Sequence, residues 1–364
     1  MTETLANPAG EPGTQRRPPL DPNAPVVLSV EDLKVQFPTE DGLVNAVNGV
    51  SYQVKAGQTL AIVGESGSGK SVSSMAVMGL HDPKRSRISG SIKLDGDELV
   101  GASQSHFRKL RSETVAMIFQ DPQSSLHPFK KVGAQIAEAY LAHHKVSKSV
   151  AAKRAVEMLD RVGVPNPTRR AKQYPFEFSG GMRQRAMIAL GLVNDPKLLI
   201  ADEPTTALDV TVQAQILDLM NDLQREFGSA IIMITHDLAV VAEVADHVLV
   251  MYAGRSVEKG TAQEVLANPR MPYTWGLLSS VPSLTADIGS DLKPIPGNPP
   301  SMLHLPAGCS FEPRCPYSDR VPGNRCKTEM PEFLEVPGEP GRLTRCHLAD
   351  PAAIFADEVA PNLE

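Results

Sequence analysis

The spacing of apolar positions changes along the chain, and each spacing predicts a different kind of element. Four short runs have the pattern of β-strands, at residues 26–30, 34–37, 50–54 and 88–94. Two longer segments, 130–145 and 147–162, have helical spacing. The second places five apolar residues on one helix face: Ala151, Ala155, Met158, Leu159 and Val162. Strands and helices then alternate to about residue 260, which predicts an α/β fold with a mostly parallel sheet covered by helices.

The two ends of the chain have a different character from its middle. Residues 1–25 contain six prolines and almost no large apolar side chains, which predicts a disordered, proline-rich tail. At the other end, Thr261 and Glu264 predict a capping box and a further helix. After Pro282 the chain becomes proline-rich and loop-like again. The folded core is therefore expected between these two stretches.

Composition and charge narrow the class of protein. The 364 residues are 41% hydrophobic and 21% charged, which excludes general disorder. A formal charge of −6 argues against a nucleic-acid-binding protein. No apolar stretch reaches the ~18–20 residues that span a bilayer, and no signal-peptide core precedes the first strand. We therefore expect a cytoplasmic protein that meets a membrane only through a partner.

A glycine-rich segment carries the strongest chemical signal. Residues 64–71 read GESGSGKS and match G-x-x-x-x-G-K-[ST] between an apolar strand and a helical run. The glycines let backbone N–H groups point at phosphate oxygens, and the helix N-terminus adds partial positive charge. Lys70 can reach the β- and γ-phosphates, and Ser71 can ligate Mg²⁺. The predicted nucleoside triphosphate site consists of Gly64, Ser66, Gly67, Ser68, Gly69, Lys70 and Ser71.

A second segment ends a buried strand with two carboxylates. Four apolar residues at 198–201 precede Asp202 and Glu203. In open α/β sheets, ligands bind at the carboxyl ends of the strands. Asp202 can hold Mg²⁺ through water, and Glu203 can face the γ-phosphate and polarise an attacking water. The pattern is weak alone, and its functional interpretation depends on the phosphate loop.

A third segment, residues 178–185, reads FSGGMRQR and leads into an apolar helical run. Ser179 is a favourable N-cap, and Gly180 and Gly181 expose backbone N–H groups at the helix start. The phosphate loop already supplies one anion cradle. This second cradle indicates either an ordinary capped helix or a surface for a nucleotide that another chain binds.

In their order along the chain, these segments and His236 resemble an ABC-type ATPase, the nucleotide-binding subunit of ABC transporters, over residues 26–265. The resemblance implies a P-loop ATPase fold with a RecA-like core, an antiparallel β subdomain and a helical subdomain at about 123–182. It also implies ATP and Mg²⁺ as ligands. By position, Glu203 resembles the general base, His236 the histidine on the γ-phosphate, and Gln120 the glutamine that touches Mg²⁺ and water.

Two further site residues follow from the same resemblance. Phe37 resembles the aromatic residue that stacks on adenine, although a place in the strand core stays open for it. Asp209 resembles the aspartate that crosses the seam of the ATPase dimer.

The signature segment at 178–185 departs from the family at two positions: it begins with Phe178 where many relatives have Leu, and it has Met182 where many have Gln. Because Ser179 and both glycines are intact, we expect the chain to hydrolyse ATP.

Two stretches narrow the resemblance to one branch of the family. Residues 64–80 read GESGSGKSVSSMAVMGL and residues 120–128 read QDPQSSLHP, with His127 where relatives usually carry Asn. Both stretches resemble the D member of the D/F pair of ATPase subunits in bacterial dipeptide and oligopeptide importers. The implied function is ATP hydrolysis that powers uptake of these peptides. An importer of nickel, a sugar or another solute is the main alternative, and a nucleic-acid-linked ABC ATPase is a weaker one.

The resemblance also implies an assembly and a place in the cell. We expect a related F-type ATPase subunit as the partner in a heterodimer, with ATP bound between the two chains. Two transmembrane permease subunits and an extracytoplasmic peptide-binding protein complete the expected transporter, and no nucleic acid takes part. The chain is expected to lie peripherally on the cytoplasmic face of the bacterial plasma (inner) membrane.

All the cysteines lie near the C-terminus, with the spacing C-x5-C-x10-C-x19-C: Cys309, Cys315, Cys326 and Cys346. In a reducing cytosol, four thiolates on one metal centre explain this cluster better than disulfides do. The spacing fits zinc or an iron–sulfur cluster, and unligated thiols stay open. Resemblance to peptide-importer subunits implies a 4Fe-4S cluster. We therefore expect a linker at 266–300, a metal-binding extension at 301–350 and a tail at 351–364.

Overall fold

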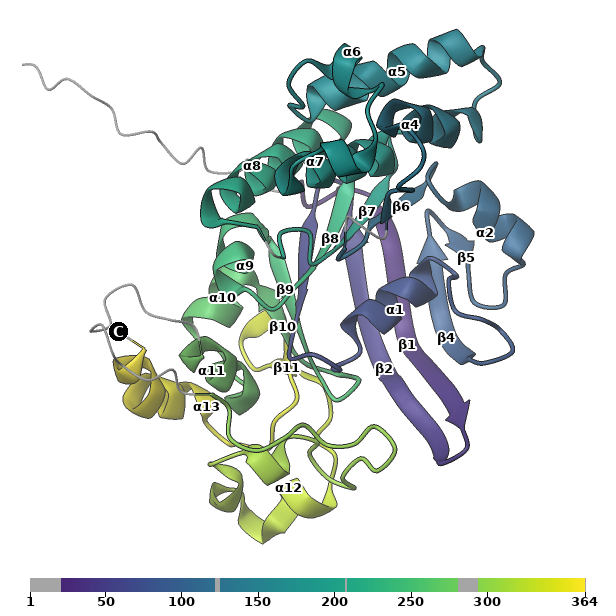
Figure 1. The fold of residues 1–364 in the computed structure, drawn as a ribbon. Helices are drawn as coiled ribbons and strands as arrows, with labels where there is room; N and C mark the ends of the chain where they lie inside the picture. Colours follow the sequence, from purple (N-terminus) through teal and green to yellow (C-terminus); the bar gives the residue numbers. More distant parts are fainter. Residues whose placement is uncertain (1–20, 122–124, 207, 281–293, 364) are drawn as a thin grey trace, which may run out of the picture.

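The computed structural model describes residues 21–121, 125–206, 208–280 and 294–363. A small antiparallel sheet lies beside a larger mixed sheet, and helices cover the larger sheet (Figure 1). Most of the tail predicted at 1–25 lies outside the described residues, and so does 281–293 of the predicted linker. The arrangement confirms the predicted α/β fold, but the larger sheet is mixed rather than mostly parallel, because the strands at one edge join it by antiparallel pairing.

The antiparallel sheet has the strand order β2-β1-β4-β5. Its strands are β1 (Val26–Thr39), β2 (Gly42–Lys55), β4 (Arg87–Leu94) and β5 (Asp97–Glu98). The runs predicted at 26–30 and 34–37 belong to one strand, because β1 pairs with β2 along its length through several register shifts. One shift surrounds Asp32, whose backbone is left-handed with φ 46°, so a bulge absorbs the break in the pattern.

The larger sheet has the strand order β11-β12-β10-β9-β3-β8-β7-β6. Its strands are β3 (Thr59–Val63), β6 (Val115–Ile118), β7 (Leu198–Asp202), β8 (Ala230–Thr235), β9 (His247–Tyr252), β10 (Arg255–Thr261), β11 (Leu334–Val336) and β12 (Glu339–Thr344). The pairs of β3 with β8 and β9, and of β7 with β6 and β8, are parallel. Every residue of β3, β7 and β8 is buried, as expected for a sheet covered on both faces.

The α-helices of the described residues are α1 (Lys70–Val77), α2 (Gln104–Leu110), α4 (Val132–Leu141), α5 (Lys148–Arg161), α6 (Pro167–Arg170), α7 (Gly180–Leu192), α8 (Val210–Phe227), α9 (Leu238–Val244), α10 (Ala262–Ala267), α11 (Pro272–Ser279), α12 (Arg325–Thr328) and α13 (Pro351–Ile354). Short 3₁₀ turns lie at 175–177, 312–314, 318–320, 322–324 and 360–362, and a π-helical turn at 355–359. Helices α4, α5 and α6 lie together at one end of the molecule (Figure 1).

Local signals set the helix boundaries. The helix predicted at 147–162 is α5, whose Ser147 side chain accepts a hydrogen bond from the N–H of Val150. Its predicted apolar face is buried, with Ala151 among the residues of one core with α4 and α7. The predicted capping box is also present, since Thr261 and Glu264 exchange hydrogen bonds at the start of α10. The helical period and the capping residues therefore predict these elements well.

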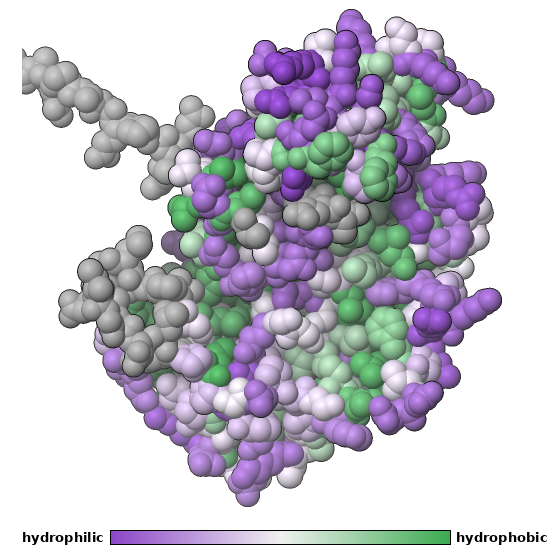
Figure 2. Space-filling view, in the orientation of Figure 1, coloured by the Kyte–Doolittle hydropathy of each residue, from purple (hydrophilic) through white to green (hydrophobic). Residues whose placement is uncertain are grey.

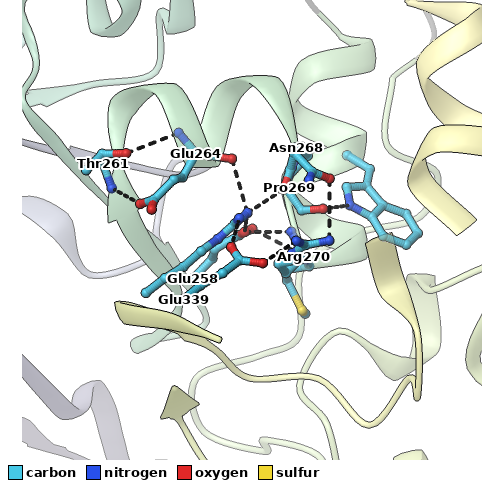
Figure 3. A network of polar contacts seen from close by, with 10 residues as sticks. Glu258, Thr261, Glu264, Asn268, Pro269, Arg270 and Glu339 are labelled. Carbon is cyan, nitrogen blue, oxygen red and sulfur yellow. Dashed lines mark hydrogen bonds and ion pairs between the residues drawn. The ribbon is translucent and has the colours of Figure 1, made fainter. Parts of the chain in front are cut away.

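The C-terminal part of the chain joins the larger sheet directly. Strand β12 pairs with β10, and a buried charge network seals the contact (Figure 3). Fully buried Glu258 accepts hydrogen bonds from the backbone N–H groups of Arg270 (2.6 Å) and Met271 (3.2 Å). Arg342 pairs with Glu258 across 3.5 Å and also with Glu339, which pairs with Arg270. Burial raises the pKa of Glu258 to about 7, although these partners oppose the shift.

Helices form in the segments predicted as a linker and a tail. Helix α11 lies in the predicted linker, and α13 begins in the predicted tail. Trp275 of α11 is buried against the rings of Tyr317 and Phe355, with centroid distances of 5.1 and 5.9 Å. Its indole N–H donates to the Pro269 carbonyl oxygen across 3.0 Å. A single tryptophan therefore organises a small core that fixes both segments.

The surface is mainly polar on the face drawn in Figure 2. Hydrophilic residues cover most of the helical region and the opposite end of the molecule, and apolar residues gather in smaller areas between them. Within the part of the chain that the structure describes, no helix has the length and hydropathy to cross a membrane.

Candidate functional site

The phosphate loop connects β3 to α1, the context that its sequence predicts. Gly64, Gly67 and Gly69 have φ angles of 148°, 77° and 99°, which side chains rarely allow. A Cβ on Gly64 would lie 2.2 Å from the Met251 carbonyl oxygen, and one on Gly69 would lie 2.4 Å from that of Ala46. Both glycines are therefore required by backbone packing as well as by backbone conformation.

Lys70 lies inside this loop. Its Nζ donates to the carbonyl oxygens of Gly64 at 2.7 Å and Glu65 at 2.9 Å, and its side chain is buried. Burial lowers the pKa of Lys70, and the nearby Glu203 and Asp202 carboxylates oppose that shift. The buried Ser68 hydroxyl has no hydrogen-bond partner among the described residues. The loop thus holds a confined amine and an unsatisfied hydroxyl, groups that a phosphate can satisfy.

The carboxyl end of β7 provides the predicted acidic pair. Asp202 is buried and accepts a hydrogen bond from the Ser71 side chain, the two residues predicted to meet at Mg²⁺. Burial raises the pKa of Asp202, and the Ser71 hydrogen bond and the charge of Lys70 act in the opposite direction. The donor set of hydroxyl and carboxylate oxygens suits Mg²⁺.

Glu203 collects partners from three other segments. Its carboxylate accepts from Gln120 Nε2 at 2.7 Å and from the Thr206 hydroxyl at 3.0 Å, and His236 Nδ1 lies 3.2 Å away. Burial alone would raise the pKa of Glu203, but these hydrogen bonds outweigh it, and the pKa is lowered. Glu203 is therefore ionised at neutral pH, as a general base must be. The sequence analysis does not identify Thr206 as a site residue. Its position, three residues after Glu203, is the signal that could have identified it.

The backbone at Glu203 explains how one carboxylate reaches so many partners. Its φ is 48°, a left-handed value that is uncommon for a residue other than glycine. The Glu203 N–H donates to the Ile234 carbonyl oxygen of β8 across 2.9 Å, which anchors the turn. Strained conformations of this kind persist where the surrounding structure fixes them. Here the strain directs the side chain toward Gln120, after β6, and His236, after β8.

The predicted signature segment caps a helix and lies at the surface. Ser179 is the N-cap of α7 and accepts from the Met182 N–H across 3.4 Å. Ser179 and Gly180 are exposed, whereas a Cβ on Gly181 would meet a Val212 side-chain carbon at 2.9 Å. The local geometry is that of a capped helix, and its exposure also leaves the backbone N–H groups open to a second molecule.

The remaining predicted nucleotide residues lie on two other elements. Phe37 lies on β1, half-buried, with its ring edge-on to His81 at a centroid distance of 5.4 Å. Phe37 also packs against the core of the antiparallel sheet, so it has the structural role that the sequence left open. Asp209 is exposed and caps α8 by accepting from the Val212 N–H across 3.0 Å.

The four cysteines belong to one apolar cluster, but they do not form a metal-binding group. All four are free thiols, and the Cys309 N–H donates to the Cys326 carbonyl oxygen across 2.8 Å. Burial raises the pKa of Cys309 to about 11 and those of Cys315 and Cys346 to about 12. Among the residues that the structure describes, no group of three or more ligating side chains could hold a metal ion. The described residues therefore give no support to the predicted four-cysteine metal centre.

Comparison with known proteins agrees with this fold. Residues 47–206 match the family described as ABC transporter, and residues 257–321 match the oligopeptide/dipeptide transporter C-terminal region. A solved structure of cbiO1 from Clostridium perfringens, part of the ABC transporter complex cbiONQ, is 32% identical with a TM-score of 0.57. The match covers 66% of this chain and 91% of that one. The phosphate loop, the Glu203 cluster and the two sheets thus define a P-loop ATPase of the ABC class.

Curated relatives narrow the class further. The oligopeptide transport ATP-binding protein OppD of Escherichia coli is 52% identical over 89% of this chain and 93% of its own length. The dipeptide transport ATP-binding protein DppD of Bacillus subtilis is 50% identical over 83% of this chain and 92% of its own. The chain belongs to the family of ATP-binding subunits of oligopeptide and dipeptide ABC transporters.

Proposed function

We propose that the chain is the ATP-hydrolysing subunit of an ABC importer and that it powers the uptake of di- and oligopeptides. The single observation that carries the proposal is the convergence of Gln120, Thr206 and His236 on the Glu203 carboxylate beside the phosphate loop. The match at 257–321 and the names of the relatives support peptides as the transported solute.

The chemistry that these residues can perform is hydrolysis of the γ-phosphate. The loop N–H groups and Lys70 bind the phosphates, and Ser71 and Asp202 are the residues that would hold Mg²⁺, which would offset the charge of the phosphates. Glu203 accepts a proton from the water that attacks the γ-phosphorus, and ADP leaves as the bond from that phosphorus to the β–γ bridging oxygen breaks. Gln120, which donates to Glu203, would orient that water and contact Mg²⁺. His236, with a side chain that is 64% exposed, is available to the γ-phosphate. Phe37 stacks on adenine in this arrangement.

The proposed active unit is a heterodimer with a related F-type subunit. Ser179, Gly180 and Gly181 of one chain face the nucleotide held by the phosphate loop of the other, and Asp209 lies at the seam. Exposure of Ser179, Gly180 and Asp209 supports this arrangement. Binding the γ-phosphate from both sides closes the dimer, and hydrolysis reopens it, because the contacts to that phosphate exist only in the closed state.

Two exposed aromatic residues support docking of a transmembrane partner. Phe129 and Phe176 are 82% and 66% exposed, and exposed apolar side chains that gather on one surface mark interaction sites. The segments that carry them meet where the Val132 N–H donates to the Gln173 carbonyl oxygen. Phe129 also lies downstream of Gln120 in the same connection between β6 and α4. This surface suits docking to two permease subunits. In the proposed transporter, those subunits hold the chain at the cytoplasmic face of the plasma (inner) membrane, and a peptide-binding protein lies on the outer side.

Uptake of labelled peptides tests the proposed solute. Cells from which the chain has been deleted are expected to lose uptake of labelled di- and oligopeptides, and the wild-type chain is expected to restore it. Uptake of nickel and of sugars serves as the control and should not change. Loss of nickel or sugar uptake with normal peptide uptake would make the solute assignment wrong. ATP hydrolysis that rises on addition of DNA would instead favour a nucleic-acid-linked ATPase.

The iron–sulfur centre, with zinc as its alternative, stays a prediction from the cysteine pattern, and no step of the mechanism depends on it. If the cysteines do ligate a cluster, the complex purified without oxygen should contain about four iron and four acid-labile sulfide atoms per chain. Cys315→Ser should remove both, with the wild-type chain as control. One zinc atom per chain would support the alternative, and absence of both metals would reject the four-thiolate site.

A further inference from the structure

The phosphate loop has an anchor that its sequence motif does not contain. Glu65, the second residue of the loop, is held at three points. Its carboxylate accepts two hydrogen bonds from Arg314, Nη1 to Oε2 at 2.7 Å and Nη2 to Oε1 at 3.0 Å. Its N–H donates to the Tyr273 hydroxyl at 2.7 Å, and its carbonyl oxygen accepts from Lys70 Nζ at 2.9 Å. The backbone position of the loop therefore depends on residues far from it in sequence.

Arg314 is itself fixed in position. Its side chain is 3% exposed and lies in the C-terminal extension, next to Cys315. Its Nε donates to the Pro296 carbonyl oxygen at 2.9 Å, and Nη2 donates to that of Ile295 at 3.1 Å. A planar guanidinium with its donors occupied in this way has little freedom to follow a moving loop. Arg314 is thus a rigid support for Glu65.

Aromatic rings complete the support. Tyr252 at the end of β9, Tyr273 of α11 and Phe311 of the C-terminal extension pack together with centroid distances of 4.5 to 5.4 Å. The Arg314 guanidinium lies 5.9 Å from the Tyr252 ring centroid and 6.0 Å from that of Phe311. Met251, next to Tyr252, is the residue whose carbonyl oxygen excludes a side chain at Gly64. The phosphate loop therefore packs against a group of aromatic residues to which the C-terminal extension contributes Phe311.

We propose that Arg314, assisted by Tyr273, is a positioning residue for the phosphate loop, so that ATP affinity depends on the C-terminal extension. Two physical effects act together. The bidentate pair fixes the Glu65 side chain and hence the loop backbone. It also neutralises a carboxylate that lies within electrostatic range of Lys70 and would otherwise repel the phosphates. The inference rests on ATP binding at this loop and does not depend on which solute is transported.

A double-mutant cycle on the full chain, assembled with its partners, tests the proposal. Arg314→Met is expected to raise the KM for ATP about five- to fiftyfold, the range for a coupled charge pair, and to change kcat less than about threefold. Glu65→Gln alone should raise KM only about two- to threefold, since it removes the charge and keeps the shape. Combining both changes should recover much of the affinity that Arg314→Met loses, because no unpaired carboxylate then remains. A residue that only stabilises the fold would not produce this recovery.

Matched variants separate loop positioning from general damage to the extension. Arg320→Met breaks a bidentate pair between the same extension and Glu358 of the C-terminal tail, and the KM for ATP should not change. If Arg314→Met does not fold, Tyr273→Phe removes only the hydroxyl that accepts from Glu65, and a KM increase of about two- to tenfold is expected. An unchanged KM in Arg314→Met or Tyr273→Phe would overturn the proposal. So would a KM increase that Glu65→Gln does not relieve. Both outcomes are independent of the peptide-uptake result.

Discussion

Replacing Glu203 by glutamine is expected to lower the rate of ATP hydrolysis by about 10²–10⁴-fold, the usual contribution of a general base. An amide cannot take a proton from water, yet it keeps the size of the carboxylate and can still accept from the Thr206 hydroxyl at 3.0 Å. The lowered pKa of Glu203 means that the wild-type side chain is ionised and ready to act at neutral pH. Phosphate release by the assembled complex at saturating ATP measures the effect.

Nucleotide binding should survive this substitution. Removing the Glu203 charge removes a source of repulsion for the γ-phosphate, so ATP affinity is expected to stay the same or to rise. The control is Glu157→Gln, the same chemical change on the exposed side of α5, where the only described ion pair is with Lys153 at 3.9 Å. Near-normal turnover in Glu203→Gln would show that another group acts as the base. A large loss of ATP affinity would show that the substitution damages the site itself.

Local patterns predict the elements that surround the nucleotide site. The strand, glycine loop and helix of the phosphate site follow from one motif, and Ser147 begins α5 where the helical period predicts. Likewise, the apolar run before Asp202 is a fully buried strand. Each of these signals arises within a few residues, because hydrogen bonds of helix caps and the burial of parallel strands act over short sequence distances.

The C-terminal strand β12 could not be predicted in this way. Its buried position is occupied by Arg342, and the other residues from Glu339 to Thr344 are at least partly exposed. A hydrophobicity pattern therefore gives no strand signal there. Arg342 is stable inside because Glu258, 84 residues earlier, and the carbonyl oxygens of Glu264 and Asn268 accept hydrogen bonds from its Nη2. Only the folded chain brings these partners together.

The same limit applies to charge pairs at the site. Glu65 and Arg314 are 249 residues apart in the sequence. Each is a charged residue of a kind common at protein surfaces, and nothing in its own segment indicates that the two form a pair. The cysteine pattern shows a different limit. Its spacing predicts a metal centre, but spacing does not report whether the thiols meet in ligating geometry, and the described residues contain no such group. Sequence therefore identifies the chemistry of local motifs more securely than contacts between distant segments.

Replacing Lys70 by alanine is expected to weaken Mg–ATP binding by about 30-fold to several-thousand-fold, the cost of removing one partner from a buried charge interaction. The ammonium is the one cation held within the loop among the described residues, where it donates to the carbonyl oxygens of Gly64 and Glu65. Without it, the phosphates keep the backbone and hydroxyl donors of the loop but lose its cation, and they meet the unbalanced charges of Asp202 and Glu203. Calorimetric titration of the full chain with Mg–ATP measures the change.

The loss should be in affinity rather than in folding. A truncated Lys70 leaves two loop carbonyl oxygens without their donor, but the loop is anchored independently by the Tyr273 hydroxyl on the Glu65 N–H and by the Gly254 N–H on the Ser68 carbonyl oxygen. The melting temperature without nucleotide should therefore stay near the wild-type value, whereas its increase on addition of ATP should disappear. Lys130→Ala, which removes a lysine paired with Glu138 at the surface, should keep that increase. ATP binding by Lys70→Ala within about threefold of wild type would contradict the assignment of the loop as the phosphate site, since a difference that small corresponds to less than 1 kcal/mol.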